Sequence, residues 1–247
     1  PDRAADELIT SATVLDREEL LEGLYSTLGD TLDRQPGVAS TFYGQGASRP
    51  VLRGLGAERV QVLTNGLGVI DVSAASPDHQ VTADGIDADK IEIVRGPAAL
   101  AYGGQAIGGV VNVIDGLSVE ELPEEPLSAD LFGAYNTVNE GTELAGKGQF
   151  TTGPFVISLS ASQRDFDNYE IPGFAESAFQ MAAEEAEGGE EGEEEEEVSG
   201  TQENSFVETQ TLAAGLSWVG DNAFFGVAIR EQTSEYGLPG GHEHGHE

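Results

Sequence analysis

The sequence predicts a membrane β-barrel, of which it holds the N-terminal portion as antiparallel strands, together with an N-terminal mixed α/β domain. Residues 1–116 mix helical and strand-like apolar spacings, and residues 117–126 are acidic and contain two prolines. Over residues 127–247 apolar residues alternate with small or polar ones, as in strands that present one face to lipid. We therefore expect a compact first domain, a linker, and the first five strands of a transmembrane barrel.

Composition excludes several classes of protein. The 247 residues contain no cysteine, which rules out disulfides and thiolate chemistry in this stretch. The formal net charge of −34 repels nucleic acid, whose binding needs a basic surface, and it concentrates cations instead. We find no phosphate-binding GK[ST] loop, no HExxH pair and no supported Ser-His-Asp set, so we expect neither an enzyme nor a catalytic cofactor.

The first domain opens with a strand-like segment, residues 8–15, which is followed by a helical pattern. Asp16 is suited to cap the helix, because its carboxylate can accept hydrogen bonds from the N–H groups of the first turn. Leucines then follow at helical spacing: Leu20, Leu21, Leu24, Leu28 and Leu32. Residues 59–63 are strand-like again, and Asn65-Gly66 predicts a hairpin turn directly after them.

A strand, a glycine-rich corner and a second strand close this domain over residues 90–115. Branched apolar residues form the first strand, namely Ile91, Ile93 and Val94. Gly96-Pro97 ends it, because proline donates no N–H and fixes its own φ. Residues 110–114, VVNVI, are almost entirely apolar, which predicts a strand buried on both faces.

This corner resembles the end of the plug domain of TonB-dependent outer-membrane receptors. The matching residues form a long ordered run: Ile91-Glu92, Val94-Arg95-Gly96-Pro97, Tyr102-Gly103 and AIGGVVNVI at 106–114. The resemblance implies a location in the cell outer membrane of a Gram-negative bacterium, among lipid and lipopolysaccharide. It also implies energy supplied by the TonB complex in the periplasm. Barrels of this family have about 22 strands, so we expect the chain to belong to a longer protein.

Residues 45–55, QGASRPVLRGL, are similar to the arginine-glycine turn of the same plug domains. Four of the eleven basic residues lie in or near this region and the corner: Arg49, Arg53, Arg59 and Arg95. Some of them could hold the plug inside the barrel by pairing with carboxylates of the wall. Ordinary surface arginines are the alternative, and the sequence leaves both open.

Connections between the later strands support a barrel more strongly than the strands themselves. Tight turns at 152–154 and 220–222 alternate with long segments at 166–204 and from 237. Outer-membrane barrels place short turns in the periplasm and long loops outside, so we expect both long segments to be extracellular. A soluble β-sandwich would show the same alternation of residues, but it does not predict this alternation of connections.

Asp78 and His79 form the strongest candidate metal site. An adjacent carboxylate and imidazole can ligate one ion, although such a pair alone is a weak signal. Residues 65–79, NGLGVIDVSAASPDH, resemble the plug apex of zinc-uptake receptors within the TonB-dependent family. The resemblance implies that Asp78 and His79 are zinc ligands and that the barrel supplies the others.

The end of the chain carries three of its four histidines: His242, His244 and His246. Imidazole suits zinc, copper and nickel, so we expect this segment to bind metal rather than to be a tag or a plain polar loop. Residues 184–197 are rich in glutamate, and we expect them to be disordered and to gather cations weakly.

Together with the candidate metal ligands, the resemblance implies TonB-dependent active import of a divalent transition metal, with zinc as the first candidate for the transported ligand. Two alternatives stay open. One is a receptor for a ferric-siderophore or cobalamin-type chelate, although such sites usually present aromatic and arginine side chains to a bulky ligand. The other is a passive metal-binding protein at the cell surface.

Overall fold

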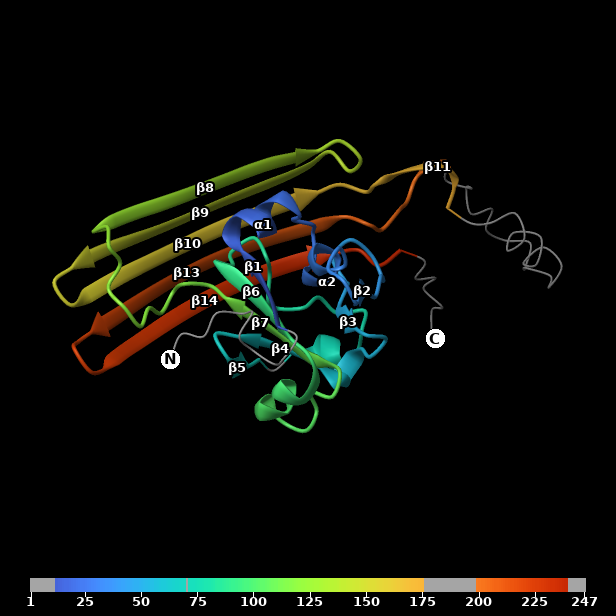
Figure 1. Cartoon of the computed structure of the whole chain (residues 1–247). Coiled ribbons are helices and arrows are strands. Elements are labelled where there is room, and N and C mark those ends of the chain that lie inside the picture. Colours follow the sequence, from blue (N-terminus) through green and yellow to red (C-terminus); the bar gives the residue numbers. More distant parts are fainter. Residues whose placement is uncertain (1–11, 70, 176–198, 240–247) are drawn as a thin grey trace, which may run out of the picture.

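The structure, a computed structural model, describes residues 12–69, 71–175 and 199–239. Figure 1 shows a mixed α/β domain that lies against one face of a sheet of five long antiparallel strands. This is the predicted fold class. No helix in the described ranges is long and apolar enough to cross a membrane.

Five short strands form the sheet of the first domain, in the order β1-β6-β7-β4-β5. Their bounds are β1 (Ala12–Asp16), β4 (Val60–Thr64), β5 (Leu67–Gly68), β6 (Lys90–Val94) and β7 (Gly109–Ile114). β7 is parallel to β4 and antiparallel to β6, and its residues from Gly109 to Val113 are buried as predicted. Asn65 and Gly66 have φ values of 52° and 77°, so the predicted hairpin turn joins β4 to β5.

Two short helices replace the single helical region suggested by the leucine spacing. Asp16 caps α1 (Arg17–Glu22) and accepts a hydrogen bond of 3.0 Å from the N–H of Glu19, as predicted. Gly23 ends α1, and Thr27 starts α2 (Leu28–Leu32) with its own side-chain cap. The remaining elements of this domain are short: β2 (Val38–Ser40), β3 (Pro50–Leu52), η2 (Ala57–Arg59), η3 (Val72–Ala74) and η4 (Gly96–Tyr102).

The second sheet, called the wall sheet below, has the strand order β14-β13-β10-β9-β8, and all neighbours are antiparallel. Its strands are β8 (Leu127–Asn136), β9 (Gly141–Thr152), β10 (Phe155–Phe166), β13 (Val207–Val219) and β14 (Phe224–Tyr236). They lie side by side in Figure 1 and curve over the first domain.

The two faces of the wall sheet are the reverse of those in a soluble protein. Large apolar side chains are exposed on the outer face: Leu131, Leu144, Ile157, Leu159, Leu212, Leu216, Val227 and Ile229. Polar side chains are buried on the inner face, against the first domain: Glu143, Ser158, Ser160, Arg164, Thr209, Thr211 and Ser217. An exposed apolar face is stable only where lipid or another protein covers it, as in a transmembrane barrel.

Two segments outside the regular strands differ from expectation. The region expected as a loop at 166–204 contains a two-stranded sheet of β11 (Glu170–Phe174) and β12 (Ser199–Thr201). The expected linker at 117–126 begins as a packed segment, because Leu117 is buried and the Val119 N–H donates to Ser217 Oγ at 3.0 Å. The glutamate-rich residues 184–197 and the histidines of the chain end lie outside the described residues.

Candidate metal site

Asp78 and His79 lie in a loop of the first domain, residues 71–82, whose two ends are tied together by one carboxylate. Asp71 accepts hydrogen bonds from the Ser73 N–H at 2.8 Å and from the Thr82 N–H at 3.4 Å. The buried guanidinium of Arg49 lies 3.6 Å from Asp71 and also donates to Ser73 Oγ. The closed base of the loop fixes the position from which its tip presents Asp78 and His79.

At the tip, the two candidate ligands contact each other and solvent. His79 Nδ1 lies 3.2 Å from Asp78 Oδ1, and the two side chains are 50% and 42% exposed. Because Nδ1 is engaged by the carboxylate, Nε2 is the ring nitrogen left to face a metal ion. The hydroxyl of Ser76 also donates to Asp78, and this hydrogen bond, followed by that from His79, lowers the pKa of Asp78. The carboxylate is therefore kept ionised, as a metal ligand must be.

Two ligands do not complete a coordination shell. Within residues 12–69, 71–175 and 199–239 no third histidine, cysteine, aspartate or glutamate joins them as a cluster. A zinc site needs about four donors, so the missing ones must come from elsewhere in the protein or from water. His242, His244 and His246 lie outside the described residues, and their positions are not part of this geometry.

The loop lies at the end of the wall sheet from which the long connections leave. The Tyr236 hydroxyl, at the C-terminal end of β14, contacts the backbone of Asp78 and Gln80. Tyr236 pairs with Val207, the first residue of β13, while the tight turns at 152–154 and 220–222 lie at the other end. In an outer-membrane barrel the end with the long connections faces outward.

A second loop of the first domain reaches the same end of the sheet. Gln45 donates to the carbonyl oxygens of Ser205 and Asp167 at 2.5 and 3.2 Å, and accepts a hydrogen bond from Asn139 at 2.5 Å. These contacts join the loop to the ends of β9, β10 and β13. Both loops are thus positioned by the wall sheet as well as by their own domain.

Beyond the candidate ligands, three acidic residues fasten the first domain to three different wall strands; they are Asp84, Asp87 and Asp89. Arg164, on β10, is fully enclosed and donates to Asp84 at 2.6 Å and to Glu143 of β9 at 2.8 Å. Removing one partner from such a pair is costly, because an uncompensated charge stays buried.

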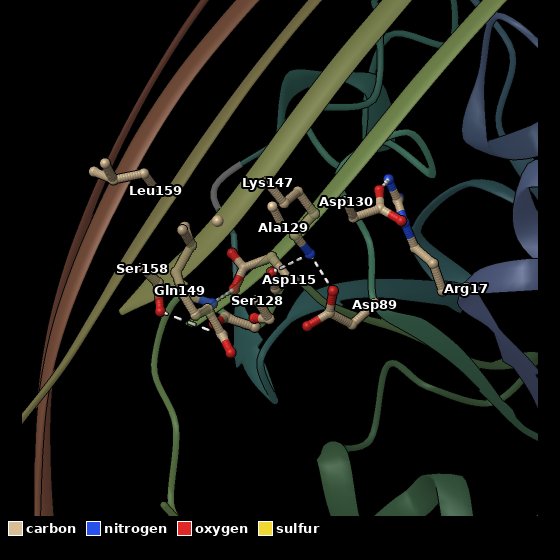
Figure 2. A pocket seen from close by; sticks show the side chains of 13 residues that line it. Arg17, Asp89, Asp115, Ser128, Ala129, Asp130, Lys147, Gln149, Ser158 and Leu159 are labelled. Atoms are coloured by element: carbon tan, nitrogen blue, oxygen red, sulfur yellow. Dashed lines mark hydrogen bonds and ion pairs between the residues drawn. The ribbon is translucent and has the colours of Figure 1, made fainter. Parts of the chain in front are cut away.

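Arg230 and Lys147 make the other two attachments. Arg230, on β14, lies 2.5 Å from Asp87, and Lys147, on β9, forms an ion pair with Asp89. Figure 2 shows the Lys147 amino group pointing at Asp89 beside a cavity of about 170 Å³. Lys147 also donates to the carbonyl oxygen of Asp115 at 2.8 Å. Its third partner is the carbonyl oxygen of Asp87 at 3.0 Å, so all three donors of the ammonium group are directed at the first domain.

Arg49 fits neither of the two interpretations that the sequence left open, because it is buried and its carboxylate partner is not in the wall sheet. Arg49 pairs inside its own domain with Asp71 instead of reaching a wall carboxylate. Among the described residues, Lys147, Arg164 and Arg230 of the wall sheet pair with acids of the first domain. Arg17 of the first domain pairs in the opposite sense with Asp130 of β8 at 2.7 Å. A signal was present in the sequence, because Lys147, Arg164 and Arg230 are isolated basic residues within alternating strands of a strongly acidic chain.

The family comparison agrees with this architecture. Residues 4–110 match the family model of the TonB-dependent receptor plug domain. This part of the chain is therefore similar to a TonB-dependent receptor plug domain. The plug and the apolar outer face of the wall sheet place it in the bacterial outer membrane.

Of two curated relatives, one is named for the transport of vitamin B12, and the name of the other states no transported ligand. The chain is 33% identical over 110 residues to the vitamin B12 transporter BtuB of Vibrio vulnificus, covering 44% of this chain and 18% of that protein. It is 29% identical over 182 residues to an iron-regulated outer membrane virulence protein of Vibrio cholerae, covering 65% of this chain and 26% of that protein. The chain therefore spans only a fifth to a quarter of these relatives.

A solved structure supports the fold over almost the whole chain. The copper transporter OprC superposes with a TM-score of 0.65 at 19% identity, covering 93% of this chain and 31% of that one. At this identity the match bears on the fold alone. The first domain and the wall sheet therefore share their fold with about a third of that protein.

Proposed function

We propose that this chain belongs to a TonB-dependent importer that carries a divalent transition metal, zinc in the first place, across the outer membrane. The observation that carries the proposal is the Asp78–His79 pair, held by a closed loop at the outward-facing end of the wall sheet. A half-exposed carboxylate and imidazole suit a bare metal ion better than a bulky chelate. We propose residues 1–116 as the plug, 117–126 as the linker and 127–247 as barrel strands and loops.

The three histidines of the chain end are proposed as further ligands on grounds of reach. Tyr236 touches the backbone of Asp78, and Gly237 and Pro239 lie against the neighbouring loop at Gly44. His242 follows Tyr236 by six residues, which span at most roughly 20 Å when fully extended. A connection of this length is compatible with His242, His244 and His246 as further ligands, and we propose them in that role.

Partners follow from the proposed class of receptor. The TonB complex would supply energy from the periplasmic side, and lipid with lipopolysaccharide would cover the apolar outer face. Transport of a ferric-siderophore or cobalamin-type chelate is the second candidate. It is favoured by Phe42 and Tyr43, which are exposed on the loop that Gln45 fastens to the same end of the wall sheet.

Zinc uptake by cells that carry the full-length receptor tests the proposal. We expect Asp78→Ala and His79→Ala to reduce uptake strongly, because each removes one ligand of the entry site. Asp221→Ala, in the tight turn at the opposite end of the wall sheet, is the matched control and should leave uptake unchanged. Deleting TonB should abolish uptake in all strains.

The outcomes separate the alternatives. Zinc retention that survives deletion of TonB would identify a passive surface binder. Unchanged zinc uptake in both variants, with loss of uptake of an iron chelate or cobalamin on deleting TonB, would identify a chelate receptor.

A further inference from the structure

Tyr236 is an inward-pointing aromatic residue at the end of β14 that touches both outer loops of the plug. Its hydroxyl accepts a hydrogen bond from the Gln80 N–H at 3.0 Å and donates one to the Asp78 carbonyl oxygen at 3.4 Å. Its ring lies so close to Gly46 that a Cβ there would be 2.6 Å from the Tyr236 side chain. One wall residue therefore holds the loop with the candidate ligands and the loop beside it.

The two backbone groups that the hydroxyl contacts lie on either side of His79. The Asp78 carbonyl belongs to the peptide unit before His79, and the Gln80 N–H belongs to the unit after it. Because each peptide unit is planar, fixing both of them restricts the φ and ψ angles of His79. The direction of the imidazole follows from these angles, so a phenol on the barrel wall determines where the ring can point.

We propose that Tyr236 is a positioning residue that orients His79 toward the metal ion and joins the metal-binding loop to β14. The inference rests on the proposed function, since it needs His79 to be a ligand. Groups that orient a metal ligand by hydrogen bonding typically change metal affinity about 10- to 100-fold when removed. Here the hydrogen bonds act on the backbone of the ligand rather than on its ring.

Tyr236→Phe tests the proposal in the purified full-length receptor, with zinc affinity measured by calorimetry. The variant keeps the ring against Gly46 and removes only the hydroxyl. We expect zinc to bind about tenfold more weakly, and we expect no further loss when the change is added to His79→Ala. Tyr135→Phe is the matched control, because Tyr135 is exposed on the outer face of β8.

A spectroscopic readout separates positioning from general loosening of the fold. With Co²⁺ as the probe, Tyr236→Phe should alter the visible absorption of the bound ion, while Tyr135→Phe should not. An unchanged affinity in Tyr236→Phe, or an equal loss with and without His79, would overturn the role of Tyr236. If His79→Ala itself leaves zinc affinity intact, the proposed metal site fails and this inference fails with it.

Discussion

Asp87 is the most deeply buried of the three plug carboxylates that face the wall sheet, with 2% of its surface exposed. Burial raises the pKa of Asp87, and the Arg230 charge, which opposes the shift, does not cancel it. The nearby charge of Asp84 acts in the same direction as burial. The Asp87–Arg230 ion pair thus contains a carboxylate whose charged form is destabilised by its removal from water.

A pH titration of stability tests this state of Asp87. Because its pKa is higher in the folded state, the folded protein retains the proton at pH values where the unfolded chain has released it. The contribution of Asp87 to the free energy of unfolding is therefore largest at acid pH. It falls as pH rises from about 4 through the folded-state pKa. Asp87→Asn cannot titrate.

Urea unfolding of both proteins across that range provides the measurement. The difference between the unfolding free energies of wild type and Asp87→Asn should shift against wild type as pH rises. A difference that stays constant between pH 4 and 8 would contradict the account.

At the scale of elements, the segment that follows β7 is fastened to the wall sheet rather than free. A Cβ on Gly215, on the inner face of β13, would collide with the carbonyl oxygen of Leu117. The added Cβ is fixed to the backbone of β13, and the group it would meet is the backbone of Leu117. Neither backbone can move away without displacing the segment to which it belongs. The acidic composition and the prolines of 117–126 gave no sign of this packing, which depends on how the plug sits in the barrel.

Gly215→Ala is expected to destabilise the receptor by about 1–3 kcal/mol, as overpacking does in well-packed interiors. The cause is displacement of residues 117–119 from β13. Gly148→Ala is the control, because the nearest neighbour of the added Cβ would be the Ser128 carbonyl oxygen at an ordinary 3.7 Å. Chemical unfolding of the two variants measures the difference between their free energies of unfolding. Equal values would contradict the prediction, because they would show that residues 117–119 can be displaced from β13 without loss of stability.

For the molecule as a whole, the elements could be predicted from local patterns but the contacts between them could not. Alternation at 155–162 predicts β10, and VVNVI predicts the buried strand β7, because both patterns express which faces are apolar. The pairing of Lys147 with Asp89 depends on the relative placement of two units 58 residues apart in sequence. Tyr236 was missed for the same reason, since its partners are backbone groups that no residue pattern marks.

The geometry around the candidate ligands could not be predicted from the sequence. Asp78 and His79 were singled out by their motif, and the structure adds the closed base of their loop and its contact with the end of β14. Their role as metal ligands stays a prediction. The arginine-glycine turn did not predict that basic side chains of the wall would pair with acidic side chains of the plug. Arg49, which belongs to that turn, pairs with Asp71 inside its own domain.

Zinc affinity of the purified full-length receptor is the measurement that tests the central claim most directly. Calorimetry should reveal a site whose affinity falls by more than about tenfold in both Asp78→Ala and His79→Ala, while Asp221→Ala binds as wild type does. Wild-type zinc affinity in both Asp78→Ala and His79→Ala would contradict the claim that this loop of the plug holds the metal.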